Sequence, residues 1–273
     1  MLRANYHTHT TFCDGADSAE DMVRAAVDLG LVHLGLSGHM DPDIHMDWPA
    51  YVAEVGRLAE AYADRIDVLM GVELDTVYDR GSCPGAEYVI GSTHFVDADP
   101  GLVFAVDASA EVLSHGCDEV FGGDWYALAR AYYDVESRVV DATGCTFVGH
   151  FDLVTRFNDE THDFDESDPR YTTPALECME HLVSQGVPFE INCGAINRGR
   201  KAEPYPRREL LRALHDLGGE ILVNSDAHDA QHLVAGFDQA IAEAVECGFT
   251  HTNVLAHDLA GNVEMRQVAL DAL

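Results

Sequence analysis

An alternation of short apolar stretches with amphipathic ones is the feature that most restricts how this chain can fold. Extended apolar stretches occur at residues 4–8, 32–37, 68–74, 88–95, 146–149, 187–192 and 220–224. Between them the apolar residues often take a helical spacing, as in the segment from Ser18, a suitable helix N-cap, to Gly30. This alternation is typical of α/β proteins with a parallel sheet. Seven such strands predict a closed or nearly closed barrel similar to a TIM barrel.

Side chains that can bind a metal end or closely follow six of the seven predicted strands. In a (β/α) barrel the carboxyl ends of all strands gather on one rim, so residues far apart in the sequence meet there. His7 and His9 are two residues apart and therefore share one face of the first strand. The predicted metal ligands are His7, His9, Asp14, His39, Glu73, His94, His150, Asp226 and His228.

Six imidazoles and three carboxylates are more donors than one ion needs, so we expect two or three divalent ions. Imidazole and carboxylate donors together suit zinc, manganese or iron. Glu73 is a candidate for bridging two ions with its carboxylate. His45 and His232, which lie in the loops after the second and seventh strands, are candidate substrate contacts that overhang the same rim.

Acidic residues outnumber basic ones, with 48 Asp and Glu against 16 Lys and Arg and a formal net charge of −32. Most of these acids are predicted to form a solvated face. Such a surface repels nucleic acid phosphates, and the sequence contains no basic run to offset the repulsion. We therefore expect no nucleic acid polymer as a partner.

The seven cysteines are far apart and include no C-x-x-C pair, which indicates free thiols in a reducing compartment. No apolar run reaches the ~18–20 residues that cross a bilayer, and no signal peptide is predicted. We expect a cytoplasmic protein without a membrane partner, built as one barrel domain over residues 1–273. The sequence does not indicate an oligomeric state.

A longer excursion and several helices are predicted after the fourth strand. Residues 96–123, which contain proline, glycine and acids, are expected to form a long excursion that packs over the site or decorates the rim. Helices are predicted at residues 125–142, 207–217 and 234–247, and another is predicted to begin at Pro174. A last strand-like piece is expected at residues 250–255.

Several motifs, in a fixed order along the chain, carry a family resemblance. They are H-T-H-T followed by C-D-G, Gly38-His39, G-V-E-L, I-G-S-T-H-F, V-G-H-F-D, F-E-I-N-C-G-A-I-N-R-G and N-S-D-A-H. In this combination the chain resembles the polymerase and histidinol phosphatase (PHP) superfamily, and within it the monofunctional histidinol phosphatases, from Tyr6 to about Phe237. The resemblance implies a distorted seven-stranded (β/α) barrel with a trinuclear metal centre. The sequence departs from the family at Gly38, where an Asp often precedes the histidine.

The resemblance also implies how the donors divide among three metals. His7, His9, Glu73 and Asp226 would hold the first metal. Glu73 would bridge to a second, held also by His94 and His150, and Asp14, His39 and His228 would hold a third. Arg198 matches a family arginine that contacts the substrate phosphate.

Phosphate-ester hydrolysis, with a small phosphorylated metabolite as the partner, is the reaction that the resemblance implies. We expect a metal-dependent phosphoric monoester hydrolase that converts L-histidinol phosphate to L-histidinol and phosphate in histidine biosynthesis. Clustered divalent ions neutralise phosphoryl charge and activate water, so a metal-bridging hydroxide is expected to attack phosphorus. Glu73, Asp226 and His228 are the candidate catalytic residues. Arg198 is expected to orient the phosphate, with Arg200 as a weaker candidate.

The leaving group is less well defined by the sequence. His45, His232 and Asp152 are candidates for its acid, and Glu190 and Asp152 for contacts to a cationic substrate end.

Three alternative functions share some of these sequence features. Amidohydrolases also place H-x-H after the first strand, but many binuclear members need a carbamylated lysine at the end of a middle strand. The single lysine, Lys201, lies instead in the loop after the sixth strand. A PHP-type enzyme acting on a nucleotide, on DNA ends or on another small phosphate ester keeps the fold and changes the substrate. A metal-binding regulatory or structural protein would not explain an arginine beside a complete set of ligands.

Overall fold

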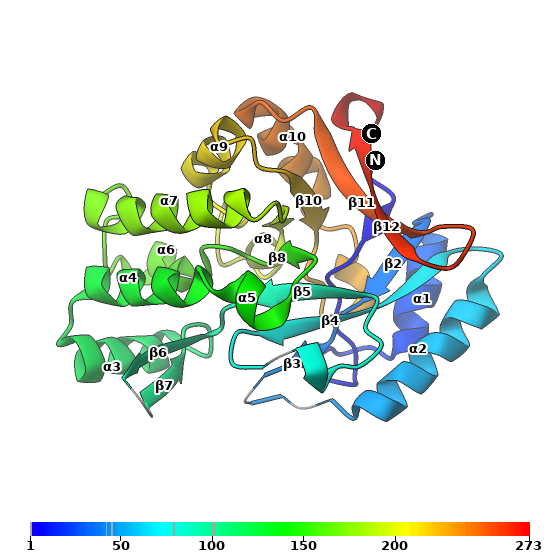
Figure 1. Cartoon of the computed structure of the whole chain (residues 1–273), viewed down its shortest axis with the longest axis horizontal. Coiled ribbons are helices and arrows are strands. Elements are labelled where there is room, and N and C mark those ends of the chain that lie inside the picture. Colours follow the sequence, from blue (N-terminus) through cyan, green and yellow to red (C-terminus); the bar gives the residue numbers. More distant parts are fainter. Residues whose placement is uncertain (1, 42, 45, 79, 100–101) are drawn as a thin grey trace.

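The computed structural model describes residues 2–41, 43–44, 46–78, 80–99 and 102–273. Seven strands pair in parallel in the order β1-β2-β4-β5-β8-β9-β10 and curve into a nearly closed barrel (Figure 1). A further short strand, β3 (His39–Met40), pairs with the end of β4. The strands of the barrel are β1 (Ala4–Asn5), β2 (His33–Leu36), β4 (Asp67–Asp75), β5 (Tyr88–Ser92), β8 (Phe147–Val148), β9 (Phe189–Asn192) and β10 (Ile221–Asn224).

Helices surround the barrel, with α4 and α7 packed side by side and α1 packed against α2 at the opposite end of the molecule (Figure 1). The side chain of Ser18 caps α1 by accepting a hydrogen bond from the Asp21 N–H. The α-helices are α1 (Ala19–Asp28), α2 (Trp48–Tyr62), α3 (Ala110–Phe121), α4 (Trp125–Glu136), α5 (Val139–Thr143), α6 (Asn158–Thr161), α7 (Pro169–Ser184), α8 (Gly194–Asn197), α9 (Arg208–Asp216) and α10 (Phe237–Cys247). Short 3₁₀ turns occur at Arg80–Ser82, Leu153–Thr155, Ala230–His232 and Leu270–Ala272.

The interior of the barrel is filled by aromatic side chains from its own strands. Tyr88 is fully buried, and its hydroxyl donates to the Tyr6 carbonyl at 2.6 Å. A Cβ atom at Gly35 would lie 2.0 Å from the Tyr88 hydroxyl, and one at Gly71 would lie 2.1 Å from the Tyr88 ring. Glycine is therefore required at these two places in the wall so that the tyrosine can cross the barrel.

The barrel closes between its first and last strands, and we call this contact the seam. Beyond the ends of β1 and β10 the chain makes a parallel bridge between Thr8 and Ala227. The His9 N–H donates to the Ala227 carbonyl at 2.8 Å, and the Ala227 N–H donates to the His7 carbonyl at 3.2 Å. The Asn224 side chain accepts from the Tyr6 N–H at 2.8 Å. The seam therefore joins two segments that are more than 200 residues apart.

The predicted barrel is confirmed, whereas several peripheral elements differ from prediction. The excursion predicted at residues 96–123 contains regular elements in its described part: β6 (Phe95–Asp99) and β7 (Leu102–Ala105) pair in antiparallel fashion and precede α3. The predicted helix at 125–142 is divided into α4 and α5. The helix predicted to begin at Pro174 begins at Pro169, because Asp168 caps it through the Arg170 N–H, and Pro174 lies inside it.

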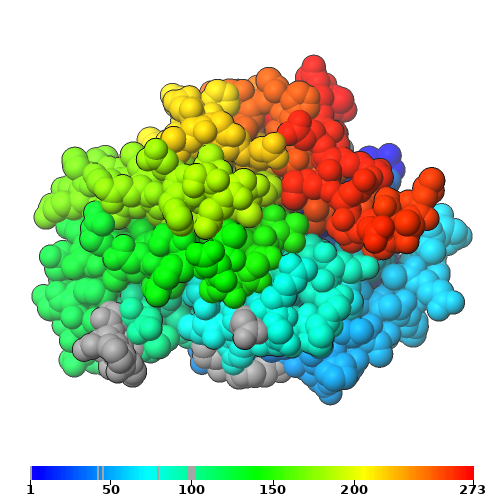
Figure 2. All heavy atoms as spheres, viewed as in Figure 1, coloured from blue at the N-terminus to red at the C-terminus, as the bar shows by residue number. Residues whose placement is uncertain are grey.

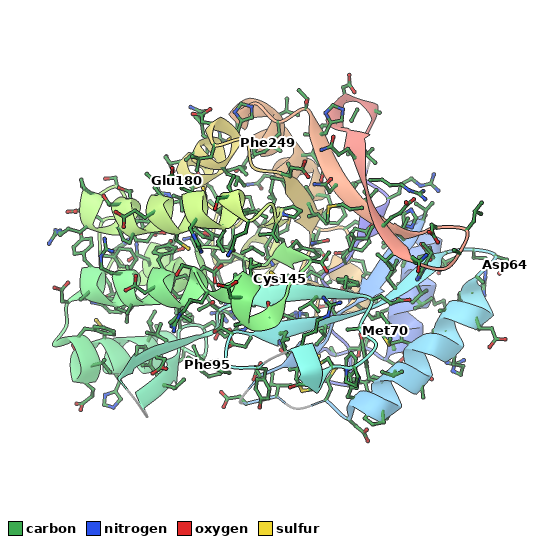
Figure 3. All side chains as sticks on the ribbon, in the orientation of Figure 1. Asp64, Met70, Phe95, Cys145, Glu180 and Phe249 are labelled. Atoms are coloured by element: carbon green, nitrogen blue, oxygen red, sulfur yellow. The ribbon has the colours of Figure 1, made fainter. Side chains whose placement is uncertain are left out.

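A second hairpin, β11 (His251–His257) and β12 (Val263–Ala269), packs on the outside of the barrel. Only its first strand was expected. In Figure 2 this hairpin forms the upper right part of the visible surface. Figure 3 shows side chains filling the space between the barrel and the helices around it. Within the described residues, none of the helices is long and apolar enough to span a membrane.

Candidate metal centre

The predicted donors from strands one to five converge on the carboxylate of Glu73, which lies near the end of β4. Its Oε2 atom lies 3.0 Å from His7 Nε2, 3.4 Å from His9 Nε2 and 3.0 Å from His39 Nδ1. Its Oε1 atom lies 2.8 Å from His150 Nε2 and 3.3 Å from His94 Nε2. Glu73 is 1% exposed, so its carboxylate is shared among five imidazoles away from water.

Two further carboxylates complete the cluster on the side of the seam. Asp226 Oδ1 lies 3.3 Å from His9 Nε2 and 3.4 Å from His228 Nδ1. Asp14 Oδ2 lies 3.0 Å from His228 Nε2, and its Oδ1 lies 3.8 Å from His39 Nε2. The structure therefore brings all nine predicted donors into one continuous cluster.

Several buried donor atoms in this cluster lack a hydrogen-bond partner, and this bears on whether the site fits metal ions. His7 Nε2, His9 Nε2, His39 Nδ1 and Glu73 Oε2 are buried and make no hydrogen bond of normal geometry within the described residues. Unpartnered buried polar atoms are costly, and these face one another at contact distance. Imidazole nitrogens and carboxylate oxygens arranged in this way fit divalent cations.

The charges of the cluster point to the same conclusion. Burial alone would lower the pKa of His7, but the carboxylates of Glu190 and Glu73 outweigh burial and raise that pKa well above its ordinary value. Burial would raise the pKa of Glu73, but the surrounding imidazoles lower it well below its ordinary value. The buried carboxylates thus attract positive charge into the cluster, whether it comes as protons or as metal ions.

Buried carboxylates behind the imidazoles fix their orientation. Glu190 on β9 is fully buried, and its Oε1 lies 2.7 Å from His7 Nδ1. Glu190 also accepts hydrogen bonds from the side chains of Asn192 and Asn224 and from the His150 N–H. Asp75 Oδ2 accepts from the His94 N–H at 2.7 Å and lies 3.3 Å from His94 Nδ1. Glu190, a candidate substrate contact in the sequence, therefore supports His7, a predicted metal ligand, from behind.

A cavity of about 60 Å³ opens beside the cluster. The cluster forms one wall of this cavity, and residues of a different kind form the other. Arg198 lines it and lies 3.4 Å from both carboxylate oxygens of Asp226, through Nη2 to Oδ1 and Nη1 to Oδ2. Arg156 and Tyr205 also line it, and Arg156 Nε and the Tyr205 hydroxyl are buried without a hydrogen-bond partner among the described residues. Asp107 lines the cavity as well, 3.3 Å from Arg156 Nη1. Unpartnered donors next to a cation site are suited to an anionic ligand.

A model of the PHP domain family matches residues 5–194 of the chain. The chain belongs to the PHP domain family. The match begins at the first strand and ends just after β9, so it contains seven of the nine donors of the cluster. The family resemblance of the sequence motifs is thereby confirmed.

Relatives of this PHP protein align over most of its length. A Deinococcus radiodurans protein named "Probable histidinol-phosphatase" is 29% identical over 264 residues, which are 89% of this chain and 92% of that protein. A Schizosaccharomyces pombe protein of the same name is 24% identical over 284 residues, covering 94% of this chain and 90% of that protein. The crystal structure of a Lactococcus lactis histidinol phosphate phosphatase, in complex with zinc, L-histidinol and phosphate, matches with a TM-score of 0.75 at 20% identity, over 97% of this chain and 100% of that chain. This likeness shows that the two PHP proteins share their fold.

The backbone of this PHP barrel is adapted to the cluster at two places. Asp226 adopts φ of +52°, a left-handed conformation that Asp tolerates better than most residues. A Cβ atom on Gly194 would lie 2.4 Å from Asp226 Oδ2, so the loop after β9 needs glycine there. At Gly38 a Cβ atom would lie 2.5 Å from Met46 Sδ and 3.0 Å from Cys13 Sγ. Met46 and Cys13 thus occupy the space that an Asp before His39 would need.

The donors group somewhat differently from the division that the resemblance implies. Among the described residues, four sets of donor atoms lie within 4.8 Å of one another: His9, Asp14, His39 and His228; His7, His9 and Asp226; His7, Glu73 and His150; and His39, Asp41 and His94. Asp41, 3.6 Å from His39 Nδ1, was not predicted. It lies two residues after a strand-end histidine, a spacing that could have drawn attention to it.

The other candidate residues lie away from the cavity or outside the described residues. His232 is paired with Asp229 at 2.7 Å and is not among the residues that line the cavity. Arg200 lies over the Phe157 ring, and Asp152 is fully buried and accepts from the Arg207 N–H. His45 lies outside the described residues.

Proposed function

We propose that this protein is a metal-dependent phosphoric monoester hydrolase that releases phosphate from L-histidinol phosphate in histidine biosynthesis. The observation that carries the proposal is a cavity bordered by two unlike groups of residues. One is the His and carboxylate cluster, which offers donors for two or three divalent ions such as zinc, manganese or iron. The other is the group of Arg156, Arg198 and Tyr205, which offers donors for an anion. The names of the PHP relatives support the same reaction.

Bound divalent ions would neutralise phosphoryl charge and supply an activated water. The guanidinium groups of Arg156 and Arg198 would hold the phosphoryl oxygens through charge-assisted hydrogen bonds. Burial raises the pKa of the Tyr205 hydroxyl, so this group stays protonated at neutral pH and can donate to the same anion. Asp226 and His228 both contact Arg198, so they lie where the two groups of residues meet. We keep these two, with Glu73, as the candidate catalytic residues.

The size of the cavity indicates which part of a substrate would lie inside it and which part would lie outside. At about 60 Å³ the cavity is small, comparable with a compact group such as a phosphoryl group. The alcohol part of the substrate would therefore lie outside, over the entrance. Asp107 lines the cavity, and the chain carries a net charge of −32, which favours a leaving group with a cationic amine.

A PHP-type phosphatase acting on a nucleotide or another small phosphate ester is the second candidate. The hydrogen-bond donors that support the first candidate support this one equally, because a phosphoryl group presents the same oxygens in every monoester. The two candidates differ only outside the cavity, where the alcohol lies.

The test is phosphate release by metal-replete protein from L-histidinol phosphate, several nucleoside monophosphates and several sugar phosphates. We expect kcat/KM for L-histidinol phosphate to exceed the others by roughly tenfold or more. A higher value for a nucleotide supports the second candidate. Absence of release from every ester contradicts the phosphatase proposal.

Metal content tests the multinuclear centre separately from activity. Protein never exposed to a chelator is expected to hold two or three ions per chain, and a value below two contradicts the proposal. Asp14→Asn should lower the number of bound ions because Asp14 faces His228 and His39 at the open side of the cluster. Asp28→Asn, an exposed change at the end of α1, is the matched control and should leave metal content unchanged.

A further inference from the structure

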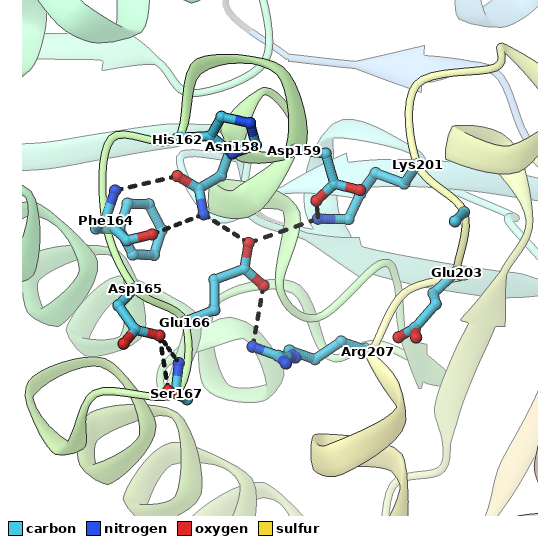
Figure 4. A pocket seen from close by; sticks show the side chains of 11 residues that line it. Asn158, Asp159, His162, Phe164, Asp165, Glu166, Ser167, Lys201, Glu203 and Arg207 are labelled. Atoms are coloured by element: carbon cyan, nitrogen blue, oxygen red, sulfur yellow. Dashed lines mark hydrogen bonds and ion pairs between the residues drawn. The ribbon is translucent and has the colours of Figure 1, made fainter.

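A second and larger cavity, of about 510 Å³, lies apart from the metal centre. Residues 158–167, around α6, form one side of it, and residues 201–207, before α9, form the other (Figure 4). It shares no lining residue with the cavity of the metal centre. Charged side chains of both signs line this cavity, as they do in many ligand-binding sites.

The charges on the two sides of this cavity pair with each other. Lys201 Nζ lies 3.1 Å from Asp159 Oδ1 and 3.8 Å from Glu166 Oε1. Arg207 Nη1 lies 3.2 Å from Glu166 Oε2, and Asn158 Nδ2 donates to Glu166 Oε1 at 2.8 Å (Figure 4). These partners satisfy the central carboxylate and the ammonium group from within the chain. The arrangement is therefore a connection between two segments.

Lys201 is the central residue of this connection. Its side chain is only 4% exposed, and its ammonium group also donates to the Thr155 carbonyl at 3.2 Å and to the Thr155 hydroxyl at 3.1 Å. A buried ammonium group is tolerated only when such partners compensate for its lost hydration. We call the contacts of Lys201 with Thr155, Asp159 and Glu166 the clasp.

The clasp joins the two loops that supply the anion-binding residues of the metal centre. Thr155 immediately precedes Arg156, in the loop after β8. Lys201 follows Arg198 by three residues, in the loop after β9 that also supplies Tyr205. Arg156, Arg198 and Tyr205 all line the small cavity. The distance between the two loops at the clasp thus sets the spacing of these donors.

We propose that Lys201 is a positioning residue that holds Arg156 on one loop and Arg198 and Tyr205 on the other at the spacing required to bind a phosphate group. This inference rests on the proposed function. Without the ammonium group, Asp159 and Glu166, which both lie on the first side of the cavity, would lose the cation that the second side contributes, so the attraction that holds the two loops together would weaken. Lys201 is not among the residues that line the cavity of the metal centre, so it would act through the two loops.

The experiment measures inorganic phosphate binding to metal-replete parent and Lys201→Met protein by calorimetry, together with metal content and steady-state kinetics. Methionine keeps the length of the side chain and removes its charge. The Kd for phosphate and the KM for the phosphate ester are expected to rise roughly tenfold, with kcat changing less and metal content unchanged. Arg130→Met, which breaks the exposed ion pair with Glu177 on α7, is the matched control and should leave all four quantities unchanged.

Asp159→Asn provides a milder variant should Lys201→Met fold poorly, because Asp159 is 44% exposed and Lys201 keeps its bonds to Thr155. It should weaken phosphate binding in the same direction by a smaller factor. Phosphate binding within twofold of the parent in both variants, or a loss of metal that accounts for the weaker binding, overturns the inference alone. A parent protein that binds no phosphate overturns the proposed function, and the inference with it.

Discussion

Glu136, on the inner side of α4, shows how a single residue can link stability to pH. It is fully buried, and neither carboxyl oxygen makes a hydrogen bond of normal geometry among the described residues, although the Thr93 hydroxyl is near. Burial raises the pKa of Glu136 from 4.5 to about 8. The folded protein therefore keeps a proton that the unfolded chain releases above pH 4.5, so its stability falls as the pH rises from 4.5 to 8.

Glu136→Gln, which resembles the protonated acid, should remove this loss. The Tm of Glu136→Gln minus the Tm of the parent is expected to be larger at pH 8 than at pH 5. The increase should be roughly 2–4 °C or more, equivalent to about 1 kcal/mol. Thermal unfolding followed by circular dichroism at the two pH values measures the difference. Glu177→Gln, an exposed change on α7, is the control. A Tm difference between parent and Glu136→Gln that is the same at both pH values contradicts the prediction.

Glu190 is expected to affect metal binding without touching a metal. Its carboxylate holds His7 Nδ1 at 2.7 Å, so Nε2 points into the cluster. Glu190→Gln should lower metal affinity by roughly 10–100-fold, the usual effect of losing a carboxylate behind a ligating histidine. Competition with a chelator measures the affinity. Glu220→Gln, at the other end of the neighbouring strand, is the control, and equal affinities in the two variants would show that Glu190 only fills space.

For a physical reason, the sequence identifies the members of the His and carboxylate cluster better than the residues that we propose to bind phosphate. Each predicted donor ends or closely follows a strand, or lies at the turn after one, and the barrel rule places those positions together. Arg156 and Tyr205 lie in irregular loops, and Tyr205 reaches the cavity through its bridge to Asn192 on β9. No periodic pattern marks such positions, because loop conformation depends on tertiary contacts such as the Lys201 clasp.

At the scale of elements, periodicity revealed the strands that are buried and missed those that are exposed. Along β12 most residues are exposed or half-buried, so no apolar alternation distinguishes it from a loop. The start of α7 was wrong because a proline at the first turn indicates a helix start, and Pro169 after Asp168 satisfies that signal as well as Pro174 does. Local signals thus locate elements that face the core, whereas surface hairpins depend on contacts made elsewhere.

The β11–β12 hairpin is attached to the barrel by a histidine whose two ring nitrogens both face carboxylates. His257 Nδ1 lies 2.6 Å from Asp67 Oδ1, and its Nε2 lies 2.8 Å from Glu87 Oε1. Burial would lower the pKa of His257, but its hydrogen bonds to Asp67 and Glu87 raise it above 6.5. The stabilisation is therefore complete below pH 6.5 and is lost as the pH rises through the higher pKa of the folded protein.

His257→Gln is accordingly expected to cost about 1 kcal/mol, or roughly 2–4 °C in Tm, at pH 6 and clearly less at pH 9. Thermal unfolding at both pH values checks this, and hydrogen exchange should show the greatest loss of protection in β11. His251→Gln, an exposed change on the same strand, is the control. An equal cost at pH 6 and pH 9 would mean that the charge of the imidazolium contributes nothing.

At the scale of the whole molecule, the dominant property is the net charge of −32. Repulsion among like charges destabilises the compact state, and it acts over about 10 Å in 0.1 M salt but only about 3 Å in 1 M salt. The Tm of the metal-replete protein is therefore expected to rise by several degrees between these salt concentrations. Sodium and potassium chloride should act alike, because screening depends on ionic strength. A Tm that stays constant or falls contradicts this account.

The seam has a consequence for the order in which the protein acquires its parts during synthesis. His7 and His9 leave the ribosome about 220 residues before Asp226 and His228, and the Thr8–Ala227 bridge aligns the two pairs. A nascent chain that ends before β10 holds the first seven donors but lacks the strand that brings the last two beside them. Complete assembly of the donor set must therefore follow ring closure, so a translation product interrupted before Asp226 cannot form the whole cluster. Ring closure thus makes the full donor set depend on a chain that extends at least to His228.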